Sequence, residues 1–202
     1  MMRTPRRAPR SDALENRARI IEAAHAAFAD DPSVSLQAIA KAAGVGQGTM
    51  YRHFPDRESL LLAVYRDELE ALVATAPRLL REYEPLDALR RWFERLAADG
   101  RVEGGAALAV RAATRAGRPH PPLLAALDLL LRAGKEAGQV RPDAEAEEIL
   151  LLGSCLWMTD GGIPCPERGT RMLAVIIDGL STGTGTGTGI GTGTGTGTGT
   201  RR

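Results

Sequence analysis

The sequence of 202 residues has few of the residue types that build metal and redox sites. It contains three histidines and two cysteines, Cys155 and Cys165, and no histidine lies near either cysteine at the spacing of a metal ligand. Two cysteines are also too few for a disulfide framework. We therefore expect a protein without a metal, a redox centre or a cofactor.

Long hydrophobic runs are also absent. The longest nearly uncharged apolar stretch covers residues 149–158, whereas a helix needs about 20 apolar residues to cross a bilayer. The chain opens with Arg3, Arg6, Arg7 and Arg10. Polar and charged residues between positions 11 and 17 then stand where a signal peptide requires an apolar segment. The expectation is a cytoplasmic protein without a membrane segment.

Catalytic groups are scarce in the same way. Three histidines, and no pairing of a nucleophile with a base, leave little from which to build an active site. We therefore expect a protein that is not an enzyme. A small helical enzyme is kept only as a remote alternative.

The net charge of +1 hides an uneven distribution along the chain. Residues 1–57 carry nine basic and six acidic side chains, and residues 58–200 carry fifteen basic and nineteen acidic ones. A basic N-terminal part joined to a mildly acidic remainder is typical of a protein that meets a polyanion with one part only.

Apolar residues recur at spacings of three and four, and no alternating run of β-branched residues is present. The pattern predicts an all-α fold of about nine helices. The first helix carries an apolar stripe and ends at Pro32; the stripe is Leu14, Ala18, Ile21, Ala24 and Phe28. The other predicted ranges are 35–43, 46–53, 56–77, 85–98, 103–116, 122–137, 142–159 and 166–180. Thr-Gly alternation follows, which cannot bury apolar area and predicts a disordered tail over 181–202.

Two short predicted helices, separated by Gly44 and preceded by a longer one, form a helix-turn-helix pattern. The second short helix is the part that enters a major groove in such motifs. The small residues Gly48 and Thr49 allow its outer side to approach DNA closely, and three longer side chains on the same helix can supply hydrogen bonds: Gln47, Tyr51 and Arg52. Its other side is apolar and predicted to join the core.

The segment IAKAAGVGQGTMYRHFPDRESLL at residues 39–61 strongly resembles the DNA-binding signature of the TetR (tetracycline-repressor-type) family. RIIEAA at 19–24, with Phe28, also fits the first helix of that family. The resemblance is close over residues 18–65, and over 66–180 it concerns the architecture alone. It implies a dimeric DNA-binding regulator, and in this family most often a repressor.

By position, the resemblance implies that one group of side chains faces bases and another holds the DNA backbone. The base-facing group is Gln37, Gln47 and Gly48. The backbone group is Thr49, Tyr51, His53 and Arg57. Arg52 occupies a variable position from which it can reach the DNA.

Two positions depart from the family pattern. Gly46 replaces the usual Ser or Thr at the N-cap of the recognition helix. This replacement lowers the stability of the helix by only about 0.3 kcal/mol. Residues 30–33 form a shorter segment than usual, which leaves the angle between the first two helices open.

The chain thus divides into a basic disordered arm (1–12), a helix-turn-helix DNA-binding domain (13–58), a helical regulatory and dimerisation domain (59–180) and the tail (181–202). The arm has two interpretations, a DNA contact in the minor groove or a solubilising segment. The apolar surface of the last two helices predicts packing against a second copy, as the family implies, with packing inside one subunit as the alternative.

The regulatory domain collects both tryptophans of the chain. Aromatic side chains between helices suit an apolar effector, and two arginines one turn apart on an Ala-rich helix suit an acidic group. The candidates are Trp92, Phe93, Arg111, Arg115 and Trp157. Core packing for the aromatics and a solvated edge for the arginines remain open alternatives. The predicted function is a homodimeric repressor that a small molecule releases from a palindromic operator; the alternative is a regulator controlled by a protein partner or by no ligand.

Overall fold

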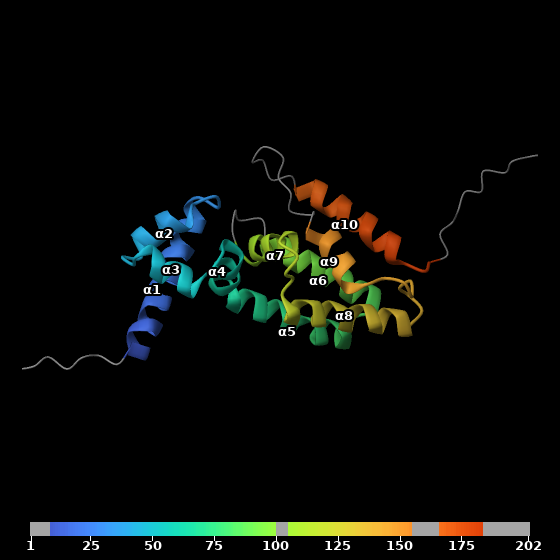
Figure 1. The fold of residues 1–202 in the computed structure, drawn as a ribbon. Coiled ribbons are helices and arrows are strands. Elements are labelled where there is room, and N and C mark those ends of the chain that lie inside the picture. The colour runs from blue at the N-terminus through green and yellow to red at the C-terminus, as the bar shows by residue number, and fades with distance from the viewer. Residues whose placement is uncertain (1–8, 100–104, 155–165, 184–202) are drawn as a thin grey trace, which may run out of the picture.

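The computed structural model describes residues 9–99, 105–154 and 166–183, and within these ranges it holds ten α-helices and no strand (Figure 1). The all-α prediction is confirmed. The first five helices are α1 (Pro9–Asp30), α2 (Leu36–Ala42), α3 (Gln47–His53), α4 (Arg57–Val64) and α5 (Arg66–Glu82). The remaining five are α6 (Pro85–Asp99), α7 (Ala106–Arg115), α8 (Pro121–Glu136), α9 (Ala146–Ser154) and α10 (Pro166–Leu180).

The helices form an N-terminal bundle (α1–α3) and a C-terminal bundle (α5–α10), and α4 packs against both (Figure 1). None of the described helices combines the length and the apolar character that crossing a membrane requires. Several predicted features lie outside the described residues: most of the N-terminal arm, Trp157, both cysteines and residues 184–202.

The apolar stripe predicted for α1 is only partly correct. Ala24 and Phe28 are fully buried as predicted, but Leu14 is 70% exposed, Ala18 is exposed and Ile21 is half-buried. Ile20, which the prediction left out, is fully buried. The physical reason is the length of α1, whose N-terminal end extends past α2 and α3, where no other described helix lies beside it (Figure 1). The buried stripe therefore begins at Ile20.

The helix predicted over 56–77 is two helices. α4 ends at Val64, Tyr65 adopts a non-helical conformation (φ −100°, ψ 25°), and α5 then continues past Pro77 to Glu82. Pro77 removes one intrahelical hydrogen bond, which normally ends a helix. Here the buried side of α5 packs against α6 and α8, and Pro77 lies on the exposed side, so tertiary packing overrides the local preference.

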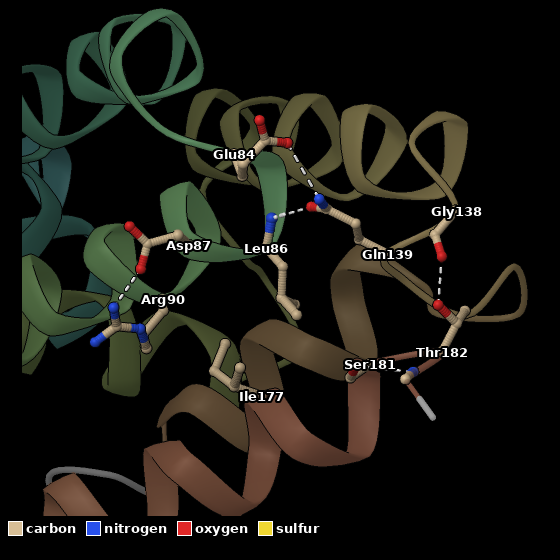
Figure 2. Close-up of a pocket in the computed structure, with 10 residues that line it drawn as sticks. Glu84, Leu86, Asp87, Arg90, Gly138, Gln139, Ile177, Ser181 and Thr182 are labelled. Carbon is tan, nitrogen blue, oxygen red and sulfur yellow. Dashed lines mark hydrogen bonds and ion pairs between the residues drawn. The ribbon is translucent and has the colours of Figure 1, made fainter. Parts of the chain in front are cut away.

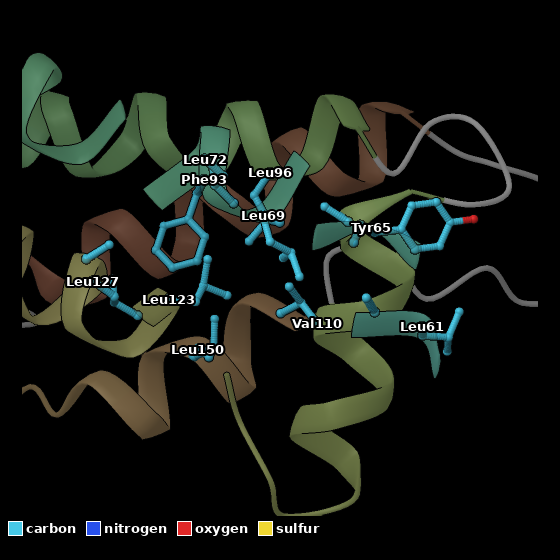
Figure 3. Close-up of a cluster of buried hydrophobic side chains, with 14 of the residues drawn as sticks. Leu61, Tyr65, Leu69, Leu72, Phe93, Leu96, Val110, Leu123, Leu127 and Leu150 are labelled. Atoms are coloured by element: carbon cyan, nitrogen blue, oxygen red, sulfur yellow. The ribbon is translucent and has the colours of Figure 1, made fainter. Parts of the chain in front are cut away.

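The C-terminal core is built from apolar residues that α5 to α9 direct toward one another (Figure 3). Its labelled members in this region are Leu69, Leu72, Phe93, Leu96, Val110, Leu123, Leu127 and Leu150. Each of them is at most 2% exposed. This core fixes the helices against which α4 is packed.

The start of α9 also differs from the prediction. The helix begins at Ala146, not at 142. Val140 pairs with Ser181 in an isolated antiparallel bridge, and the amide of Arg141 donates to the carbonyl of Leu180 at 2.8 Å. A turn, in which the amide of Ala144 lies 3.4 Å from the carbonyl of Arg141, stands at the predicted start of the helix. Ser181, predicted to belong to the tail, is therefore tied to the α8–α9 loop.

Thr182 adds to this connection. Its amide donates to the carbonyl of Gln139 at 3.1 Å, and its hydroxyl donates to the carbonyl of Gly138 (Figure 2). Net stabilisation by one hydrogen bond is about 0.5–1.5 kcal/mol. The end of α10 is thus held by bonds that a Thr-Gly composition does not reveal.

We expect two truncations of the tail to differ. Deleting residues 184–202 should leave the melting temperature unchanged, because the Thr-Gly composition, interrupted only by Ile190, offers too little apolar surface to a core. Deleting 182–202 removes the two bonds of Thr182 as well and should lower it by about 2–4 °C, the effect of about 1 kcal/mol in a chain of this size. Calorimetry of the two truncated proteins measures the difference, and equal melting temperatures would contradict a stabilising role for Thr182.

Candidate nucleic-acid interface

The turn between α2 and α3 is fixed by Gly44. Its backbone has φ +64°, a left-handed conformation that strains any side chain. The amide of Gly44 donates to the carbonyl of Lys41 at 3.1 Å, and the amide of Val45 donates to that of Ala40 at 3.0 Å. These two bonds form a Schellman motif, which ends α2 and sets the direction in which α3 starts.

Helix α3 is anchored by its inner face. Met50 and the C-cap residue Phe54 are each 1% exposed, and both belong to the hydrophobic core. Gly46 is the N-cap of α3, as predicted, and provides no side-chain hydrogen bond there. With one face buried, the opposite face of α3 is the one left for a partner.

The outer face of α3 carries the side chains predicted to read DNA. Gln47 and Gly48 are exposed, and Tyr51 is 46% exposed. A Cβ atom built on Gly48 would meet nothing within 4 Å, so open space lies in front of this backbone. Gln37 is exposed on the neighbouring helix α2. The arrangement can bring side chains and backbone to the edges of bases in a major groove.

Arg52 lies along the surface of its own helix. Its Nε donates to the carbonyl of Gly48 at 2.9 Å, and an Nη atom donates to Oγ1 of Thr49 at 3.4 Å. These contacts are exposed, so the side chain can exchange them for a phosphate or a base. Thr49 and His53 are half-buried, and the ring of His53 lies 6.5 Å from that of Phe54. The DNA contacts of these residues stay predictions.

Arg57 has partners that the sequence pattern did not indicate. Its guanidinium donates to the carbonyls of Pro32 and Val34 and lies 4.8 Å from the centre of the Phe28 ring. Burial lowers the pKa of Arg57, while Glu58 acts to raise it. The side chain thus ties both α1 and the short α1–α2 connection to the start of α4. Contact of Arg57 with the DNA backbone stays a prediction.

Gly48 allows a direct test of this surface. Replacing it with alanine should stabilise the exposed helix by about 0.5–1 kcal/mol, because glycine inside a helix is unfavourable by that amount. The same methyl group occupies the space predicted for the DNA, so operator affinity should fall at least about tenfold. Thermal unfolding and fluorescence anisotropy of labelled operator DNA measure the two effects.

The matched control is Gly46→Ser, two residues away. Its Cβ also meets no protein atom within 4 Å, and serine is a better N-cap than glycine by a few tenths of a kcal/mol, about 0.3. We expect this variant to keep operator affinity. A Gly48→Ala protein that gains stability and binds operator normally would show that Gly48 does not face DNA.

The aromatic residues predicted to line an effector site lie in the C-terminal core. Trp92 and Phe93 are fully buried and in edge-to-face contact, with ring centres 5.3 Å apart. The indole nitrogen of Trp92 donates to the carbonyl of Leu72 at 3.2 Å. On α7, Arg111 is half-buried and Arg115 is exposed. The structure therefore brings the two aromatics together, and contact of any of these residues with an effector stays a prediction.

An open groove of about 490 Å³ lies elsewhere, between α6, the α8–α9 loop and the end of α10 (Figure 2). The side chain of Gln139 spans it, with its amide nitrogen 3.2 Å from the carboxylate of Glu84 and its oxygen 3.0 Å from the amide of Leu86. None of the residues predicted for the effector lines this groove. The two hydrogen bonds of the Gln139 side chain join the start of α6 to the α8–α9 loop.

Two family models match the chain. One, described as "Bacterial regulatory proteins, tetR family", matches residues 20–64, and the other, "Transcriptional regulator SbtR-like, C-terminal domain", matches residues 84–182. The HTH-type transcriptional regulator SAB2452 of Staphylococcus aureus is 38% identical over 76 residues, which are 37% of this chain. The match spans 41% of the length of that relative.

Solved structures match over more of the chain. The TetR transcriptional regulator SCO0520 from Streptomyces coelicolor is 33% identical, with 82% of this chain and 98% of that chain covered and a TM-score of 0.49. Thermus thermophilus FadR, a TetR family transcriptional repressor in complex with lauroyl-CoA, is 25% identical, with 81% and 94% covered and a TM-score of 0.52.

Proposed function

Because the chain belongs to the TetR family of DNA-binding transcriptional regulators, we propose that it acts as a homodimeric repressor that a small molecule releases from a near-palindromic operator. The observation that carries the DNA-binding part is the outer face of α3. Gln47, Gly48 and Tyr51 are exposed there while the opposite face is buried, which is the arrangement of a recognition helix.

The proposal of a dimer is supported by exposed apolar side chains on the last two helices. Leu151 and Leu152 on α9 are 51% and 52% exposed, and Val175 on α10 is 71% exposed. α9 and α10 contact each other, so these side chains belong to neighbouring elements. Apolar patches of this kind are typical of subunit interfaces, and a two-fold axis would pair the same helices of two copies.

The proposal of an effector is supported by the family and by composition. FadR is described as bound to lauroyl-CoA, a molecule with a long apolar chain and acidic groups. By analogy, we propose a largely apolar effector among α6 to α9, with Trp92 and Phe93 beside its apolar part and Arg111 or Arg115 beside an acidic group. Such a ligand would favour a spacing of the two recognition helices that no longer fits successive major grooves.

One observation favours the alternative, a regulator controlled by a protein partner or by no ligand. Trp92 and Phe93 have no exposed surface, and the indole N–H already has an acceptor. A ligand that touches them must therefore displace core contacts. This alternative keeps the same DNA-binding surface and differs in what controls it.

An operator-release assay distinguishes the two. Labelled operator DNA bound to the protein is titrated with acyl-CoA thioesters and with aromatic acids, and anisotropy reports release while tryptophan fluorescence reports binding. A ligand that prefers the DNA-free state about a hundredfold, about 2.7 kcal/mol, releases a substantial fraction. Arg111→Ala should lower the affinity for acidic ligands and leave the affinity for neutral ligands unchanged. If no ligand of the panel causes release or a fluorescence change, the result favours the alternative.

A further inference from the structure

An ion pair joins the two halves of the molecule. The guanidinium of Arg118, in the turn between α7 and α8, lies 2.7 Å from a carboxylate oxygen of Asp56 and 3.9 Å from one of Glu58. Asp56 immediately precedes α4, so the pair links the C-terminal bundle to the segment that leaves the recognition helix. The Arg118 side chain is 59% exposed and that of Asp56 is 27% exposed.

The backbone of Arg118 is held rigidly relative to α7. Gly117 has φ +67°, its amide donates to the carbonyl of Thr114 at 3.0 Å, and the amide of Arg118 donates to that of Ala113 at 2.9 Å. These bonds form a second Schellman motif, in which glycine supplies the left-handed residue. A shift of the end of α7 therefore carries Arg118 with it.

Asp56 is held just as firmly on the other side. It is the N-cap of α4, and its carboxylate accepts a hydrogen bond from the amide of Ser59 at 2.8 Å. Burial acts to raise the pKa of Asp56, but the bonds from Arg118 and Ser59 together lower it below its ordinary value. Asp56 follows Phe54, the buried C-cap of α3, by two residues. A displacement of Asp56 therefore reaches the end of the recognition helix.

We propose that Arg118 is a positioning residue that couples the C-terminal bundle to DNA binding by holding Asp56 against the end of α7. The inference rests on the proposed function, because it names the contact through which the state of one bundle reaches the other. α4 packs against α7, and most of the buried residues of α7 are alanines: Ala106, Ala107, Ala109 and Ala113. The ion pair adds a directional contact to this packing.

The exposure of the pair suits such a role. Exposed ion pairs change an equilibrium by about fivefold at most, because water screens them and the side chains lose freedom. A contact of this strength biases the orientation of α3 and can still be broken when α7 moves. A deeply buried pair would fix one orientation permanently.

A double-mutant cycle tests the proposal. Asp56→Asn removes the charge and keeps an oxygen that can cap α4, since asparagine is as good an N-cap as aspartate. Arg118→Gln removes the guanidinium, and the double variant removes both. We expect each single variant to change the operator dissociation constant by about threefold to fivefold in the same direction, and the double variant by no more than either single one. Fluorescence anisotropy on a selected operator provides the constants.

Arg78→Gln on the exposed side of α5 is the matched control for the loss of one positive charge, and its operator affinity should equal that of the wild type. Amide hydrogen exchange in the absence of DNA provides a second readout, and residues 47–54 should exchange faster in Arg118→Gln than in Arg78→Gln. Unchanged affinity and unchanged exchange, or effects that add in the double variant, would overturn the coupling. Failure of the wild type to bind any DNA would instead overturn the proposed function, and the exchange comparison would still test the link.

Discussion

Tyr51→Ala is expected to weaken binding to every DNA sequence, whereas Gln47→Ala is expected to change which sequence is preferred. Both side chains are exposed on α3, so removing them leaves the core intact. Loss of a base contact at Gln47 should cost about 1–3 kcal/mol at one base pair, and loss of a backbone contact at Tyr51 should reduce all affinities by a common factor. Titration of an operator and its single-base variants separates the two patterns.

The control for this experiment is the melting temperature, which should match that of the wild type in both variants. Normal operator affinity in both would show that this face of α3 does not contact DNA. If Gln47→Ala also reduced the affinity for every sequence by the same factor, Gln47 would contact the DNA backbone and not a base.

A charge placed on the proposed dimer face should have the larger effect. Leu152→Glu combined with Val175→Glu puts two carboxylates into an apolar contact, and burying an unpaired charge costs several kcal/mol, about 3–5. We expect monomers by light scattering at micromolar concentration. Operator affinity should fall at least about a hundredfold, because each monomer then binds one half-site without its partner.

Leu129→Glu provides the matched control. Leu129 is an exposed leucine on α8, 41% exposed, and lies outside the proposed interface. The variant adds a carboxylate and should remain dimeric with normal operator affinity. Dimers that persist in the α9–α10 variant would locate the subunit contact elsewhere.

The helix-turn-helix could be predicted because its signals are local. Ser35 and Asp56 cap α2 and α4 through amides three residues away, and Gly44 forms the turn with its immediate neighbours. Periodicity likewise predicts that most of the chain is helical. These features depend on a few consecutive residues, so one sequence is sufficient to recognise them.

The errors arise where distant parts of the chain decide the structure. α5 passes Pro77 because α6 and α8 hold it, and the segment before α9 pairs with the end of α10 through Val140 and Ser181. Leu14 is exposed because none of the described helices reaches it. Periodicity cannot show how far a partner helix extends.

The partners of arginine are the least predictable part of the candidate site. Arg57 donates to loop carbonyls, and Arg118 pairs with Asp56 from a turn far along the chain. Long flexible side chains can reach many acceptors, so their partners depend on the final packing of all helices. No spacing or motif in the sequence indicates either contact.

The most direct measurement is in vitro selection of the DNA that the wild-type protein binds from a random duplex library. A dimer that reads DNA with α3 should enrich a near-palindrome whose half-sites are centred one helical turn or a multiple apart, about 10–10.5 base pairs per turn. The same selection with Gln47→Ala should relax the preference at one symmetric pair of positions. No enrichment, or a single unpaired site read identically by both proteins, would contradict recognition of DNA by a dimer through α3.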